Sequence, residues 1–145
     1  MVGRLVTDLI EAARAARKRS KAPYSGFEVG AAVLGGSGRI YTGSNVEVSS
    51  YGLTICAERL AICVALHEGE SVLSQIAIVA ATEGPPGPCG ACRQFMYDFA
   101  PDATVDMVNL EGSRRTSSVR DLLPDAFGPG DLERFRVRQE QSNAE

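Results

Sequence analysis

Thr54-Ile55-Cys56-Ala57-Glu58-Arg59 is the stretch around which the chain is organised, and Pro88-Cys89-Gly90-Ala91-Cys92 completes it about thirty residues later. Cys89 and Cys92 are three residues apart, so in the first turn of a helix their sulfurs point the same way. Cys56 begins another apolar helical pattern and can supply a third thiolate. Three thiolates around Zn²⁺ leave one tetrahedral position free for water, as a catalytic zinc site requires.

Glu58 lies two residues beyond Cys56. A zinc-bound hydroxide can attack an amidine-like carbon only if a neighbouring group collects its proton and returns it to the departing amine, and a carboxylate can do both. Zinc nucleobase deaminases share this pattern of a ligand-x-Glu pair followed by Pro-Cys-x-x-Cys. Arg59 is next in the sequence and can hydrogen-bond the ligand sulfurs, which would restore some of the electrophilicity that three thiolates remove. A surface cation is the alternative reading of Arg59.

The remaining cysteine and the single histidine lie too far from Cys56 to share its metal. Cys63 is two helical turns away, about 10 Å, and we expect it to be a packed core thiol. His67 is about 16 Å along the same helix. Its position also excludes a serine-histidine triad at this site.

The composition is that of one globular domain. The chain has 145 residues, of which 44% are hydrophobic and 23% charged, so it can form a core without disulfides. The sequence has no long apolar run and no signal peptide, so we expect a cytoplasmic protein without a membrane partner. In the reducing cytoplasm, clustered cysteines bind metal more often than they form disulfides. A net charge of −3 argues against a nucleic-acid partner.

The hydrophobic pattern predicts alternating helices and strands. Helices are expected over residues 4–18, 55–69 and 90–99. Strands are expected over residues 27–34, 39–43, 74–81, 104–110 and 115–119. This order predicts an α/β fold, a three-layer α/β/α sandwich around a five-stranded mixed sheet. Residues 1–136 should form this single domain, ending in a helical turn at 131–135, and residues 137–145 a disordered tail.

Five blocks of the sequence, in the same order along the chain, resemble the homotetrameric cytidine deaminase family. They are Ala22–Val33 (APYSGFEVGAAV), Gly43–Glu47 (GSNVE), Tyr51–Arg59 (YGLTICAER), Pro88–Gln94 (PCGACRQ) and Leu122–Pro129 (LLPDAFGP). One departure is Val48-Ser49-Ser50, where the family usually has Asn-Ala-Ser or similar. The resemblance implies a cytidine deaminase-like fold.

The resemblance also implies the reaction, which is hydrolytic deamination of cytidine and deoxycytidine to uridine and deoxyuridine plus ammonia, in pyrimidine salvage. One Zn²⁺ per subunit would be held by Cys56, Cys89 and Cys92. Zinc-bound hydroxide would attack C4 of the base, with Glu58 as proton shuttle.

Substrate contacts follow from the same resemblance. Phe27 would line the base pocket, and the backbone at Ala57 would hold the pyrimidine carbonyl. Asn45 and Glu47 would hold the ribose 3′-hydroxyl. The residues alone are compatible with this, because in an extended segment both side chains face one side and together suit sugar hydroxyls; a turn with a solvated glutamate is the alternative.

Tyr51 and Phe127 would reach into a neighbouring subunit's pocket, so that each site of a homotetramer is built from several chains. The alternative for Phe127 is a core residue of a C-terminal cap.

Four other functions compete with this interpretation. A blasticidin S-type deaminase has a similar zinc site and fold, but Asn45, Glu47 and Phe127 favour an unmodified ribose. A thiol redox protein could use the Cys89/Cys92 pair. A structural zinc module would need a fourth ligand within reach. A polynucleotide editor would need a basic channel and more aromatic side chains than the 6% present.

Overall fold

A mixed five-stranded sheet forms the centre of the computed structural model, which describes residues 2–143. The strands lie in the order β2-β1-β3-β4-β5. Their bounds are β1 Val29–Gly35, β2 Ile40–Ser44, β3 Leu73–Ala80, β4 Thr104–Asn109 and β5 Arg114–Ser118. The pair β3–β4 is parallel and the other pairs are antiparallel. The predicted five-stranded mixed sheet is therefore confirmed.

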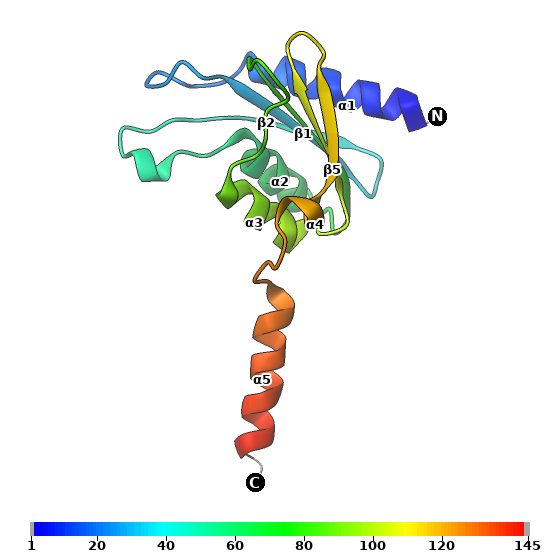
Figure 1. Ribbon diagram of the computed structural model, residues 1–145, viewed down its shortest axis with the longest axis vertical. Coiled ribbons are helices and arrows are strands. Elements are labelled where there is room, and N and C mark those ends of the chain that lie inside the picture. Colours follow the sequence, from blue (N-terminus) through cyan, green and yellow to red (C-terminus); the bar gives the residue numbers. More distant parts are fainter. Residues whose placement is uncertain (1, 144–145) are drawn as a thin grey trace.

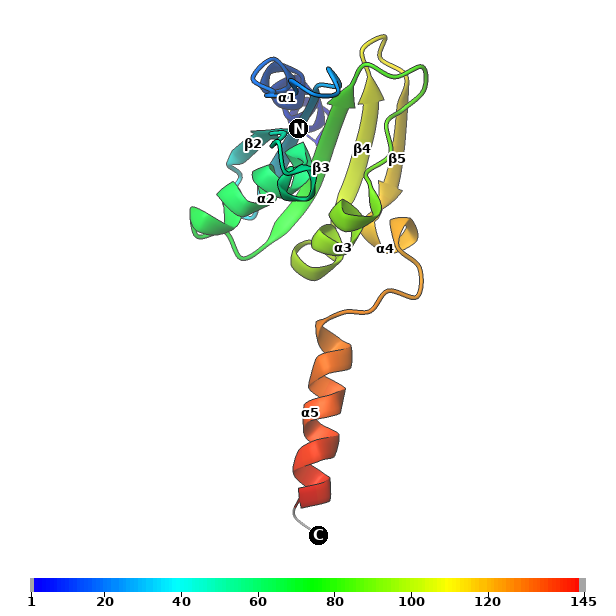
Figure 2. The same ribbon diagram turned by 90° about the vertical axis from the view of Figure 1, so that its left-hand side faces the viewer.

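Helices cover both faces of the sheet (Figures 1 and 2). The helices are α1 Val2–Arg17, α2 Ala57–His67, α3 Gly90–Phe99, α4 Val119–Leu122 and α5 Pro129–Asn143, with a short 3₁₀ helix at Tyr51–Leu53. Along β3, Ile76 and Ile78 pack in the core that contains α2 and α3 residues, whereas Ala77 and Val79 pack in the core that contains α1 residues. A strand buried on both faces explains why β3 is almost continuously apolar.

The two helices that carry the site each begin directly after a cysteine. Cys56 and Cys89 are the N-cap residues of α2 and α3, and both have extended backbone conformations. The parallel β3–β4 pair requires a crossover, and α3 supplies it. Within residues 2–143 no helix is long and apolar enough to cross a membrane.

Cys63 is exposed on α2, so its prediction as a packed core thiol is wrong. The buried face of α2 is formed by Ala57, Glu58, Ala61, Ile62 and Ala65. Apolar residues surround this helix on nearly every side, and the sequence pattern therefore does not reveal which side faces the sheet.

The C-terminal segment is also different from the prediction. In place of one helical turn and a disordered tail from residue 137, α5 continues to Asn143, and the expected domain boundary at 136 falls inside it. Arginine, glutamate, glutamine and leucine favour helix, and Gly130 is the last glycine or proline. The polar composition of residues 137–145 is typical of a disordered tail, and no α5 side chain is buried.

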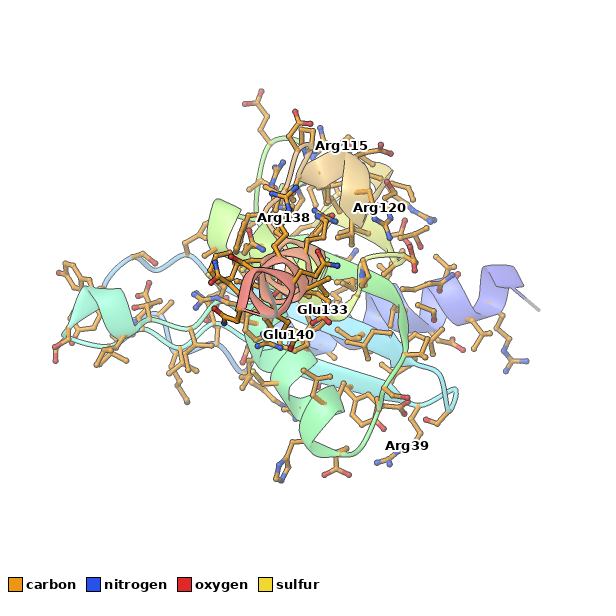
Figure 3. The ribbon with its side chains drawn as sticks, turned by 90° about the horizontal axis from the view of Figure 1, so that it is seen from below. Arg39, Arg115, Arg120, Glu133, Arg138 and Glu140 are labelled. Atoms are coloured by element: carbon orange, nitrogen blue, oxygen red, sulfur yellow. The ribbon has the colours of Figure 1, made fainter. Side chains whose placement is uncertain are left out.

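Helix α5 extends away from the sandwich in both views (Figures 1 and 2). Seen end-on, its charged side chains Glu133, Arg138 and Glu140 point outward around the helix (Figure 3). Its structure therefore depends on local propensity and on short contacts, such as the ion pair of Arg134 with Asp131.

Candidate active site

Three cysteines meet where α2 and α3 begin. Cys56 caps α2, Cys89 caps α3, and Cys92 lies in the first turn of α3. Their three Sγ atoms lie within 4.8 Å of one another, and the Sγ atoms of Cys56 and Cys89 are 3.8 Å apart. Two N-terminal helix dipoles thus point at a cluster of sulfurs, which favours thiolate over thiol.

The geometry of this cluster fits a zinc ion. Tetrahedral coordination with Zn–S bonds of about 2.3 Å puts two ligand sulfurs about 3.8 Å apart, the separation found for Cys56 and Cys89. The group of possible metal ligands in residues 2–143 contains neither Cys63 nor His67. Three thiolates fit one zinc ion per chain with a fourth coordination position left for another ligand.

The charge state of the sulfurs is set by their mutual hydrogen bonds. A hydrogen bond with Cys92 lowers the pKa of Cys56 to about 5, and burial opposes part of this shift. The same hydrogen bond, together with burial, raises the pKa of Cys92. Before any metal binds, the negative charge is therefore favoured on Cys56 over Cys92.

Arg59 lies against this charge. Its Nη2 donates to Cys56 Sγ at 3.4 Å and to the Thr54 carbonyl at 3.2 Å. The contact with Cys56 is the main cause of the raised pKa of Arg59. The side chain is thus tied to the site and is not a free surface cation.

Glu58 is buried beside the cysteines, with only 5% of its surface exposed. Burial raises the pKa of its carboxyl group to about 7, and the negative charge on Cys56 adds to the shift. A carboxyl group with a pKa near neutrality can both accept and release a proton, as general acid-base chemistry requires.

A pocket of about 290 Å³ opens next to the cysteine cluster. Of the residues predicted to bind substrate, Phe27, Asn45 and Ala57 line it together with Cys56, Cys89 and Glu58. Several lining residues were not predicted: Val29, Thr54, Ile78, Ala80, Thr82, Pro86 and Gly87. Thr54 follows the 3₁₀ helix, and the others come from β1, from β3 and from the segment between β3 and Pro88. Their residue types carry no chemical signature that the sequence alone could reveal.

Glu47 lies in a neighbouring pocket with Tyr24, Ser25 and Tyr51, and Thr54 lines both pockets. The Glu47 carboxylate accepts hydrogen bonds from the Tyr24 and Ser25 backbone N–H groups and from Ser25 Oγ. The Ser25 hydroxyl is the main cause of the lowered pKa of Glu47. The carboxylate is therefore charged at neutral pH and acts as a hydrogen-bond acceptor.

Two aromatic side chains predicted to bind substrate are exposed in the single chain. Tyr51 is 72% exposed and packs edge-on against Tyr24. Phe127 is 61% exposed and lines neither pocket. Its carbonyl accepts a hydrogen bond from Gln94 on α3, which holds the loop before α5 in place.

Arg93, also not predicted, supports the loop that presents the cysteine pair. Its Nε donates to the Pro88 carbonyl at 2.9 Å and its Nη1 donates to the Leu122 carbonyl at 2.8 Å. These contacts tie the start of α3 to the end of α4. In the sequence, Arg93 is marked only by its place directly after Cys92, within the block Pro88–Gln94.

Known proteins provide an independent comparison. The family model described as "Cytidine and deoxycytidylate deaminase zinc-binding region" matches residues 5–107. Cytidine deaminases of Sporosarcina psychrophila and Halalkalibacterium halodurans are 44% and 46% identical, over 88% and 86% of this chain and 94% and 95% of their own lengths.

Solved structures of cytidine deaminases are also similar to this chain. A cytidine deaminase from Burkholderia pseudomallei superposes with a TM-score of 0.82 at 49% identity, covering 83% of this chain and 98% of that one. One from Mycobacterium tuberculosis superposes with a TM-score of 0.75 at 39% identity, covering 84% and 96%.

Proposed function

This chain belongs to the cytidine and deoxycytidylate deaminase family, and from that membership we propose that it hydrolyses cytidine and deoxycytidine to uridine and deoxyuridine plus ammonia. The observation that carries the proposal is the three-cysteine cluster opening onto a pocket that also contains Glu58. A zinc ion bound there with an open coordination position supplies a water molecule of lowered pKa, which is nucleophilic at neutral pH.

Glu58 moves the protons of the reaction. Its carboxylate takes a proton as water adds to C4 of the cytosine ring and delivers it to the amino nitrogen. The bond from C4 to that nitrogen then breaks and ammonia leaves. The burial that raises the pKa of Glu58 to about 7 suits a group that must take up and release a proton in each cycle.

Arg59 tunes the metal site. Its hydrogen bond to Cys56 Sγ withdraws negative charge from one of the three thiolates. Three thiolates and Zn²⁺ together would carry a net charge of −1, which without such a hydrogen bond would make bound water a poorer acid. Arg59 thus supports the electrophilic character that the reaction needs.

Substrate binding follows the pocket lining. Phe27 packs against the base, and the backbone at Ala57 bonds the pyrimidine carbonyl. Asn45 and Glu47 bind the 3′-hydroxyl of the sugar from the two neighbouring pockets. Support comes from the position of Phe27, Asn45 and Ala57 in the pocket next to the cysteines and from Thr54, which lines both pockets.

We further propose a homotetramer in which Tyr51 and Phe127 of one subunit complete the pocket of another. The exposure of both aromatic side chains supports this assembly. So does the face of α2 that carries Cys63 with the partly exposed Leu60 and Val64, because apolar side chains grouped on a surface mark interaction sites.

A cytoplasmic location and a place in pyrimidine salvage belong to the same proposal, since clustered free cysteines suit a reducing compartment.

We also propose residues 1–136 as the catalytic domain, because no side chain of α5 is buried. A chain ending at Arg136 should then keep its zinc and its activity.

An absorbance assay of five compounds tests the function: cytidine, deoxycytidine, cytosine, cytidine monophosphate and blasticidin S. We expect turnover of the two nucleosides, much lower kcat/KM for cytosine, and rejection of the phosphate, whose dianion would meet the carboxylates of Glu47 and Glu58. Preferred turnover of blasticidin S would instead identify a modified-nucleoside deaminase. Cytosine or the monophosphate reacting as well as cytidine would overturn the nucleoside assignment.

Glu58→Gln is the matched control for this assay. The amide has nearly the same shape but cannot accept the proton, so the variant should keep its zinc and lose several orders of magnitude in kcat. Retention of about a tenth of the wild-type kcat would remove Glu58 from the mechanism.

A further inference from the structure

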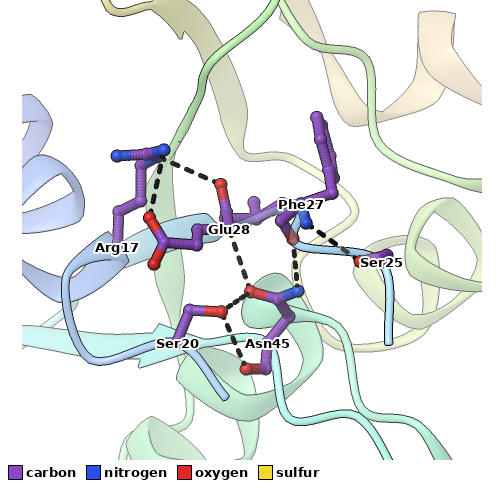
Figure 4. A network of polar contacts seen from close by, with 7 residues as sticks. Arg17, Ser20, Ser25, Phe27, Glu28 and Asn45 are labelled. Carbon is purple, nitrogen blue, oxygen red and sulfur yellow. Dashed lines mark hydrogen bonds and ion pairs between the residues drawn. The ribbon is translucent and has the colours of Figure 1, made fainter. Parts of the chain in front are cut away.

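Asn45 joins three segments of the chain beside the pocket (Figure 4). Its side-chain Oδ1 accepts hydrogen bonds from Ser20 Oγ at 2.5 Å and from the Val29 backbone N–H at 2.9 Å. Its Nδ2 donates to the Phe27 carbonyl at 2.8 Å. Only 7% of Asn45 is exposed, so these partners, and not solvent, decide how the amide is oriented.

The hydrogen-bonding capacity of this amide is almost fully used. An amide oxygen accepts two hydrogen bonds and an amide nitrogen donates two. Oδ1 already has both of its partners, and the partner of Nδ2 within residues 2–143 is the Phe27 carbonyl. One N–H of Asn45 is therefore left for the pocket. Rotating the amide by 180° would place like groups against Val29 and Phe27, which forbids the opposite orientation.

Asn45 is consequently a donor and not an acceptor toward anything in the pocket. Glu47 has the opposite character, because its carboxylate can only accept. A hydroxyl group can satisfy both, since its oxygen accepts from Asn45 while its hydrogen is donated to Glu47.

We propose that Ser20 is a positioning residue for substrate binding, acting through Asn45. Ser20 lines neither pocket. Its hydroxyl occupies the second acceptor site of Oδ1. It thereby adds a third anchor to the two from Val29 and Phe27 and helps keep the free N–H of Asn45 directed at the sugar hydroxyl. The inference rests on the proposed function, in which Asn45 binds the 3′-hydroxyl of a cytosine nucleoside.

The position of Ser20 in the chain makes this role possible. Ser20 follows the end of α1, and the adjacent Lys21 N–H donates to the Asn45 carbonyl at 2.9 Å. Arg17, one turn earlier, holds the segment before β1 through its contacts with the Glu28 carbonyl and carboxylate (Figure 4). The end of α1 is thereby locked to Val29 at the start of β1 and to Phe27 just before it.

Steady-state kinetics of the zinc-loaded enzyme with cytidine and 3′-deoxycytidine test the proposal. Ser20→Ala should raise KM for cytidine about five-fold, the factor that one ordinary hydrogen bond contributes, and leave kcat unchanged. With 3′-deoxycytidine the same substitution should change neither constant, because the hydroxyl that Asn45 binds is missing. Ser74→Ala is the control; it removes a hydroxyl that bonds the Leu34 carbonyl at the opposite end of β3.

The pair Ser20→Thr and Ser20→Val separates the hydroxyl from the shape of the side chain. Threonine should restore the wild-type KM and valine should not. Zinc content and thermal unfolding of each variant show whether the fold is kept.

Equal losses of kcat/KM with both nucleosides would assign Ser20 a merely structural role and overturn the proposal. An unchanged KM in Ser20→Ala, or a valine variant equal to the threonine variant, would do the same. A wild-type enzyme that does not distinguish cytidine from 3′-deoxycytidine would overturn the contact between Asn45 and the hydroxyl and the role of Ser20 with it. In these measurements, a wild-type enzyme inactive on cytidine would overturn the proposed function as well.

Discussion

The four cysteines fall into two chemical groups that only their surroundings distinguish. Cys56, Cys89 and Cys92 share one site at two helix N-termini, whereas Cys63 is an exposed thiol on α2. We expect each of the three clustered sulfurs to be needed for zinc binding, because two thiolates do not complete a tight site in a chain whose histidine lies elsewhere.

Cys89→Ala should therefore lose both zinc and activity, and the loss of a metal that links the starts of α2 and α3 should lower the thermal stability. Metal analysis and thermal unfolding measure these effects. Cys63→Ala is the matched control and should keep its zinc, with a change in unfolding free energy within about 0.5 kcal/mol, as expected for an exposed position. Full zinc occupancy in Cys89→Ala would contradict the ligand assignment.

Glu58 makes the stability of the metal-free chain depend on pH. Its carboxyl pKa is raised from 4.5 in the unfolded chain to about 7 by burial. The folded state binds the proton more tightly, so the stabilisation is complete below pH 4.5 and is lost as pH rises through 7. The total loss is up to about 3 kcal/mol, since one pKa unit corresponds to about 1.4 kcal/mol.

In chelator-treated protein the lowered pKa of Cys56 acts in the opposite direction over this range, so the contribution of Glu58 is measured as the difference between wild type and Glu58→Gln in urea unfolding at pH 4.5 and at pH 8. From the lower to the higher pH, the free energy of unfolding of the wild type should fall by about that amount relative to that of Glu58→Gln, which has no titrating group at this position. Parallel pH profiles for the two proteins would show that Glu58 is not a buried titrating group.

At the scale of elements, the site depends on how closely α2 approaches β2. A Cβ atom built on Gly43 of β2 would lie 2.4 Å from the Ala57 carbonyl oxygen and 2.5 Å from the Ala61 nitrogen. Both neighbours are helix backbone and cannot move independently. Glycine at this position lets the first turn of α2, with Cys56 before it and Glu58 within it, sit directly on the sheet.

Gly43→Ala should push α2 away from β2 and displace Cys56 from the other two sulfurs. We expect destabilisation of about 2 kcal/mol or more, as for other overpacked core positions, and reduced zinc occupancy. Unfolding curves and metal analysis are the measurements. Gly3→Ala is the control, because a Cβ there meets nothing within 4 Å and alanine favours helix. A stable, fully zinc-loaded Gly43→Ala would refute the close-packing argument.

At the scale of the whole molecule, the surroundings of Phe127 should differ between the single chain and the proposed tetramer. In one chain the side chain is 61% exposed and outside the pocket. If it completes the pocket of a neighbouring subunit, Phe127→Ala should raise KM for cytidine, by about ten-fold for a lost aromatic contact, and should leave zinc content unchanged.

Kinetics at decreasing enzyme concentration, together with sedimentation, provide the second measurement. Activity should fall as the tetramer dissociates. A core role for Phe127 would instead lower the unfolding temperature with little change in KM. Full activity of a demonstrably monomeric enzyme would exclude shared sites.

Patterns among residues close together in the sequence were sufficient to predict much of the structure of this protein. The spacing of Cys89 and Cys92 predicted that both sulfurs point the same way, and the period of apolar residues predicted the strands and helices of the sandwich. The position of Glu58 two residues after Cys56 made it the candidate proton carrier, which stays a prediction. These features depend on residues within a few positions of one another, where backbone geometry alone determines direction.

Tertiary contacts decided the rest. Cys63 faces outward because the sheet contacts another side of an almost uniformly apolar α2. Asn45 and Glu47, two residues apart, line separate pockets because Ser20, Phe27 and Val29 hold the amide while Tyr24 and Ser25 hold the carboxylate. These partners lie 16 to 25 residues away along the chain, and side-chain direction at such sites is set by which segments the fold brings together, information that no local period contains.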